Sequence, residues 1–111
     1  MKANFYDTLN LQDGGHEVVA GGPLNWGEMA GVQQVRVIAR ITQDPTYGSG
    51  WGDFNRPGND GTWSCVVPAA NGGVFQPGQR ALAAGVVVVR DPAPKENPWP
   101  WPARPLLRQQ P

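Results

Sequence analysis

Hydrophobic and polar positions alternate over several segments of this chain, a pattern typical of strands that bury one face. The clearest segment runs from Val32 to Thr42, where an apolar set alternates with a mixed set. The apolar set is Val35, Val37, Ala39 and Ile41, and the mixed set is Arg36, Ile38 and Arg40. A second strand is predicted over Thr62 to Pro68, with Trp63, Cys65 and Val67 on one face. A third, Gln79 to Arg90, becomes apolar on both faces near its end, which predicts a central strand.

Between the first two strands, the segment from Gln43 to Gly61 is rich in Gly, Asp, Asn and Pro. These residue types favour turns, so a long connection is predicted there. Three aromatic residues lie in it, and we take them as a possible ligand-binding loop: Tyr47, Trp51 and Phe54.

Composition agrees with an all-β chain. Glycine (15) and proline (12) are abundant, which disfavours helices and favours short strands joined by turns. A length of 111 residues corresponds to a single domain. We therefore expect an antiparallel two-sheet sandwich, with a small barrel as the alternative.

Several turn and strand signals carry a resemblance to a known family. They are Asp60-Gly61-Thr62-Trp63-Ser64, Val67-Pro68-Ala69, and Pro77-Gly78 before an alanine- and valine-rich strand. Over residues 32–90 the chain resembles bacterial immunoglobulin-like and fibronectin III-like modules, which implies an immunoglobulin-like sandwich. The chain departs from those modules where Arg80-Ala81-Leu82 stands in place of an aromatic residue, and in the length of the segment 43–61.

The C-terminal segment is rich in proline and tryptophan. Proline excludes a helix or a central strand, so an extended, polyproline-like tail is predicted. We divide the chain into an N-terminal arm (1–13), a sandwich domain (14–91) and this tail (92–111). At about 3.1 Å per residue the tail would reach roughly 60 Å, enough to wrap a neighbouring subunit. The residues expected to contact that partner are Pro98, Trp99, Pro100, Trp101, Leu106 and Leu107.

Charge and sequence motifs argue against several classes of function. Nine basic and nine acidic side chains balance, so no basic surface for nucleic acid is expected. No run of about 18 apolar residues indicates a membrane span, and the N-terminus has no secretory h-region. Cys65 is the only cysteine, so no internal disulfide is expected, which fits the cytoplasm or a particle assembled inside a cell, such as a virion. His16 is the only histidine and no nucleophile motif accompanies it, so we expect no enzyme.

One acidic segment resembles a set of calcium ligands. Its oxygen-bearing residues are Asp53, Asn55, Asn59 and Asp60. The spacing fails the EF-hand pattern and Arg56 adds positive charge, so the alternative is that these residues form turns. No cofactor is expected. The sequence favours a non-enzymatic accessory subunit that binds other protein subunits in a larger assembly, such as a virion decoration or cementing protein. The alternatives are a carbohydrate-binding module that uses exposed Trp and Tyr, and an adhesive module.

Overall fold

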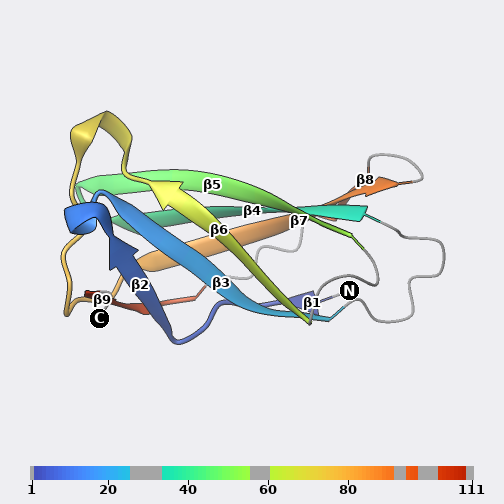
Figure 1. Ribbon diagram of the computed structural model, residues 1–111, viewed down its shortest axis with the longest axis horizontal. Coiled ribbons are helices and arrows are strands. Elements are labelled where there is room, and N and C mark those ends of the chain that lie inside the picture. The colour runs from blue at the N-terminus through green and yellow to red at the C-terminus, as the bar shows by residue number, and fades with distance from the viewer. Residues whose placement is uncertain (1, 26–33, 56–60, 92–94, 98–102, 110–111) are drawn as a thin grey trace.

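The protein consists of two β-sheets, as a computed structural model shows (Figure 1). The structure describes residues 2–25, 34–55, 61–91, 95–97 and 103–109. The first sheet contains β1 (Lys2–Ala3), β2 (Thr8–Gln12), β3 (Glu17–Asn25), β6 (Thr62–Pro68) and β9 (Leu106–Gln109). The second contains β4 (Gln34–Gln43), β5 (Thr46–Asn55), β7 (Leu82–Asp91) and β8 (Lys95–Asn97). The predicted all-β class is confirmed, and the pairing is antiparallel except between β2 and β9.

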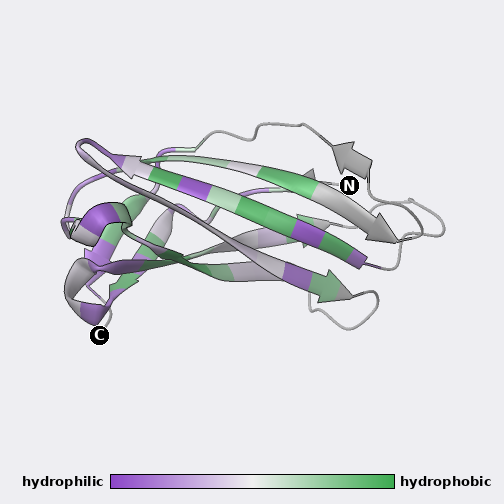
Figure 2. Ribbon diagram, turned by 90° about the horizontal axis from the view of Figure 1, so that it is seen from above, coloured by the Kyte–Doolittle hydropathy of each residue, from purple (hydrophilic) through white to green (hydrophobic). Residues whose placement is uncertain are grey.

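The core lies between the two sheets and is built by the alternation expected from the sequence. Hydrophobic and hydrophilic residues follow one another along the long strands in Figure 2. The inward residues of β4 and β6 are those predicted, namely Val35, Val37, Ala39, Ile41, Trp63, Cys65 and Val67. Trp63 is held in place on two sides. Its Nε1 donates to the carbonyl oxygen of Asn4 over 2.8 Å, and its ring meets that of Phe5 edge to face at 5.2 Å.

The position of β7 agrees with the prediction of a central strand. It pairs with β4 along its whole length and with β8 at Val87–Val89. The strand begins at Leu82, three residues later than the alternation at Gln79 suggested. Residues 78–83 instead bond to the C-terminal segment, with Ala83 and Ala103 exchanging two backbone hydrogen bonds of 2.9 Å.

The long connection predicted over residues 43–61 is corrected, because most of it is strand β5. Asp44 and Pro45 form the turn of a β4–β5 hairpin, and Gln43 pairs with Thr46. The glycines that suggested a loop occupy the inward positions of β5, where the backbone of β6 leaves no space for a side chain. A Cβ on Gly48 would collide with the carbonyl oxygen of Pro68, and one on Gly50 with that of Val66.

The two segments expected to act as arms also belong to the sheets where the structure describes them. Strands β1 and β2 pair with β3, so the N-terminal residues are part of the first sheet. In the tail, β8 pairs with β7, and β9 runs parallel to β2. Asn97 lies opposite Val87 and Ala103 opposite Ala83, so both flanks of positions 98–102 are attached to β7. A free strap of 60 Å is therefore not compatible with the described part of the tail.

The C-terminal segment joins the two sheets along one side. On one edge β9 pairs with β2. On the other, the Leu107 carbonyl accepts a hydrogen bond from the Gly78 amide, and the Leu107 amide donates one to Gln79, in the segment that leads into β7. On the opposite side a single bridge links Gly48 of β5 to Ala69 after β6. The sandwich is thus partly closed toward a barrel along these two sides.

Candidate binding face on the second sheet

The outward-pointing residues of β5, β4 and β7 form one continuous surface, which we call the outer face. Three of its cross-strand rows are defined by register: Trp51–Ile38–Val86, Ser49–Arg40–Ala84 and Tyr47–Thr42–Leu82. A fourth row pairs Asp53 with Arg36. These residues point outward because they alternate with the buried residues of β4 and β7 and with the inward glycines of β5.

Large apolar side chains on the outer face are unusually exposed. Tyr47, Trp51 and Leu82 are 50%, 56% and 49% accessible, and Ile38 and Val86 are half-buried between them. Among described residues, the other large apolar side chains with comparable exposure are Tyr6 and Val66, on the first sheet and its connections. The outer face therefore concentrates apolar surface that folding alone leaves in water.

Trp51 is held by an arginine that is itself fixed by a carboxylate. Arg36 donates from Nε and Nη2 to the two carboxylate oxygens of Asp53, over 2.8 and 3.1 Å. The guanidinium carbon lies 3.8 Å from the centroid of the Trp51 ring. The hydrogen bonds to Asp53 raise the pKa of Arg36, against a smaller opposing effect of desolvation. One face of the indole is consequently covered by a charge-neutralised arginine.

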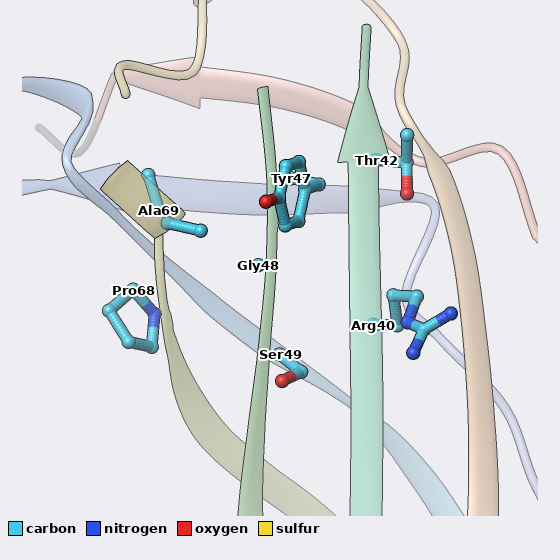
Figure 3. A pocket seen from close by; sticks show the side chains of 8 residues that line it. Arg40, Thr42, Tyr47, Gly48, Ser49, Pro68 and Ala69 are labelled. Atoms are coloured by element: carbon cyan, nitrogen blue, oxygen red, sulfur yellow. The ribbon is translucent and has the colours of Figure 1, made fainter. Parts of the chain in front are cut away.

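A hollow of about 590 Å³ opens beside the third row (Figure 3). It is lined by residues of β4 and β5, by the last residue of β6 and by the two residues after it: Arg40, Thr42, Tyr47, Gly48, Ser49, Pro68, Ala69 and Ala70. The Tyr47 hydroxyl accepts a hydrogen bond of 3.1 Å from Asn71 Nδ2, which fixes the ring at the rim. A second hollow of about 250 Å³ is lined by Ile38, Arg40, Ala84, Gly85 and Val86.

Arg40 separates these two hollows. Its neighbours in the row, Ser49 and Ala84, are small, which is why space remains on both sides of its side chain. Within the part of the chain that the structure describes, Arg40 makes no hydrogen bond or ion pair, in contrast to Arg36. Among the described residues, the outer face therefore presents one guanidinium that is paired with a carboxylate, that of Arg36, and one that is not, that of Arg40.

The structure separates the three aromatic residues predicted as a ligand loop. Tyr47 and Trp51 share the outer face, four positions apart on β5, which corresponds to about 13 Å. Phe54 points to the opposite side and packs against the core. Sequence reasoning missed Arg40 and Leu82 as partners of this surface, although the alternation of β4 already placed Arg40 on its wet side.

The calcium candidates are not brought together in the described residues. The Asp53 carboxylate is bound by Arg36, and Asn55 ends β5. Asn59 and Asp60 lie outside the described residues. Over the ranges that the structure describes, no three His, Cys, Asp or Glu side chains gather in a way that suits a metal ion.

The predicted partner contacts in the tail divide into two groups. Pro98, Trp99, Pro100 and Trp101 lie outside the described residues. Leu107 is fully buried in the protein's own core, so it is removed from the expected contact set, and Leu106 is half-buried.

Cys65 belongs to the core as a small apolar side chain. Burial raises the pKa of its thiol to about 11, so the thiol is protonated at neutral pH and is a poor nucleophile. His16 lies on the surface, with Nδ1 3.1 Å from the carbonyl oxygen of Gly73. No helix among the described residues has the length and apolar character needed to cross a membrane.

Comparison with models of known families, with curated proteins and with solved structures finds no match to this chain. The two-sheet architecture is compatible with a β-sandwich, and the immunoglobulin-like resemblance of residues 32–90 stays a prediction. A function for this chain must therefore be inferred from the geometry of the outer face.

Proposed function

We propose that this protein is a non-enzymatic accessory subunit that binds another protein through the outer face of β5, β4 and β7. The observation that carries the proposal is the clustering of Tyr47, Trp51 and Leu82, each about half exposed, on one face of one sheet. Tyrosine, tryptophan and arginine are the residue types most enriched at the energetic centres of protein interfaces.

The rigidity of the outer face supports this role. Trp51 contacts Arg36, and the Tyr47 hydroxyl is hydrogen-bonded to Asn71, so each ring has a side-chain contact that favours its position before a partner arrives. Prior ordering lowers the entropic cost of association. The expected setting is a larger assembly formed inside a cell or as a virion, and an immunoglobulin-like module with such a face fits an adhesive or decorating role.

Carbohydrate binding is the second candidate, because Tyr47 and Trp51 are exposed on the same strand face. One observation weighs against it. The Arg36 guanidinium covers one side of the Trp51 ring, and Asp53 holds it there. A sugar that stacked on that side would have to displace a bidentate ion pair.

The test compares two exposed aliphatic residues in different sheets. Leu82 on the outer face and Val66 on β6 are 49% and 44% accessible, so Leu82→Ser and Val66→Ser remove similar exposed surface. The tagged protein is isolated from its native cells, co-purifying proteins are identified, and each is reconstituted with the purified chain for a Kd measurement.

We expect Leu82→Ser to weaken a reconstituted complex about tenfold and Val66→Ser to change it less than twofold. The proposal is wrong if only Val66→Ser weakens the complex. It is also wrong if no protein forms a complex while a polysaccharide saturably quenches tryptophan fluorescence and Trp51→Ala abolishes the quenching.

A further inference from the structure

Arg40 is the feature of the outer face that the proposed function does not yet use. It is exposed, lies between two hollows, and has no acidic partner among the described residues, whereas Arg36 four positions earlier is bound by Asp53. On the outer face the carboxylate of Asp53 is bound by Arg36, whereas Arg40 keeps its positive charge without a carboxylate partner among the described residues. The charge is centred between two apolar rows.

We propose that the outer face binds an extended acidic segment of a partner protein, with a partner carboxylate on Arg40 and apolar side chains on the rows at either side. This inference rests on the proposed function and names the chemistry of the partner. A guanidinium donates two parallel hydrogen bonds to the oxygens of a carboxylate, and the Ser49 hydroxyl in the same row is a further donor.

The dimensions of the outer face suit an extended chain. From the row of Arg36 to the row of Thr42 is six residues along β4, or about 20 Å, and the outer two of its three strands are about 10 Å apart. Neighbouring rows are two residues apart, which is also the spacing of side chains on one side of an extended segment. When a partner segment runs along β4 with its carboxylate on Arg40, the partner residues two positions before and after that carboxylate therefore lie over the Trp51 row and the Tyr47 row.

This alignment predicts the partner motif: an apolar residue, any residue, Asp or Glu, any residue, and a second apolar residue. A second copy of this chain fits less well. A two-fold pairing centred on this surface, with its axis near Arg40, would bring Arg40 of one molecule toward Arg40 of the other, and like charges at an interface oppose association.

The test uses two short peptides that differ in one group. Acetyl-Leu-Thr-Glu-Thr-Leu-amide is titrated into the ¹⁵N-labelled full chain, followed by its neutral counterpart acetyl-Leu-Thr-Gln-Thr-Leu-amide. Amide shifts report the site, and their concentration dependence gives Kd. Arg40→Gln is compared with Arg108→Gln, which removes the same charge from β9 in the first sheet.

We expect the glutamate peptide to shift the amides around Arg40, Tyr47 and Ser49 and to bind about five- to tenfold more tightly than the glutamine peptide. Arg40→Gln should abolish that preference and Arg108→Gln should preserve it. The inference is overturned if the two peptides bind equally, if neither shifts these amides at millimolar concentration, or if Arg108→Gln removes the preference as well. The proposed function survives such a failure if Leu82→Ser still weakens a reconstituted protein complex, so the two outcomes are distinguishable.

Discussion

Replacing Gly50 by alanine tests the close packing of β5 on β6. In an open strand this substitution would stabilise a protein by about 0.4–1 kcal/mol, because alanine restricts the unfolded chain. Gly50 does not have the positive φ that would itself strain alanine. The space that the alanine methyl group would need is nevertheless filled by the backbone of β6. The new Cβ would collide with the carbonyl oxygen of Val66, and it would lie 3.0 Å from the carbonyl carbon of Val66 and 3.3 Å from Val67 Cα.

Backbone cannot give way as a flexible side chain can, so the two sheets must separate or β5 must shift. Overpacking of this kind costs about 1–3 kcal/mol and outweighs the entropic gain. We expect Gly50→Ala to lower the free energy of unfolding by about 2 kcal/mol. For a domain of this size that corresponds to a fall in Tm of about 8 °C.

Urea unfolding followed by circular dichroism and a thermal scan measure the effect. Ser49→Ala is the matched control, because the adjacent side chain is exposed, and its effect should stay within about 0.5 kcal/mol. Gly52→Ala should fall between the two, since the nearest backbone oxygen, that of Ser64, is 3.0 Å away. A Gly50→Ala variant as stable as the wild type would refute the packing of β5 against β6.

Three further predictions address the core and its chemistry. Leu107→Ala should lower the free energy of unfolding in urea by about 2–4 kcal/mol, and Leu106→Ala should lower it distinctly less, because Leu107 is fully buried and Leu106 is not. Equal effects of the two substitutions would contradict the placement of β9. Trp63→Phe should lower the free energy of unfolding by about 2 kcal/mol, since it removes part of a buried side chain together with its hydrogen bond to the Asn4 carbonyl. An unchanged urea midpoint would contradict that packing. Because the folded pKa of Cys65 is raised to about 11 from an ordinary value of 9.0, the folded state holds the proton longer. The stability that this pKa difference contributes is fully present below about pH 9 and is lost as the pH rises toward 11. The free energy of unfolding should therefore fall less steeply between about pH 9 and 11 in a Cys65→Ala variant than in the wild type. Parallel plots of unfolding free energy against pH would contradict the raised pKa.

The strands that could be predicted are those whose own side chains alternate. In β4 and β6 every buried residue is apolar, and most outward residues are polar or charged, with Ile38, Val66 and Pro68 as the exceptions. Period-two alternation was therefore sufficient to find these strands. In β5 the inward positions are glycines, because the backbone of β6 lies too close to leave room for a side chain. This contact between distant segments cannot be recognised from the local sequence of β5. Turn propensity therefore predicted a loop where tertiary contact selects a strand.

Pairing between distant segments explains the remaining differences between the fold predicted from the sequence and the structure. The parallel pairing of β2 with β9 joins residues nearly a hundred positions apart, and no local signal marks it. The same holds for the outer face. Alternation placed Arg36, Ile38 and Arg40 on one side of β4, but only the β4–β5 hairpin brings Tyr47 and Trp51 beside them.

The most direct test of the binding face is cross-saturation NMR on the ¹⁵N-labelled protein in complex with a protein that co-purifies with it. Saturating the partner should attenuate amides along β4, β5 and β7, with the strongest losses around Ile38, Arg40 and Trp51. Attenuation confined to β3 and β6, or to positions 98–102, would contradict the assignment of the outer face as the site of contact.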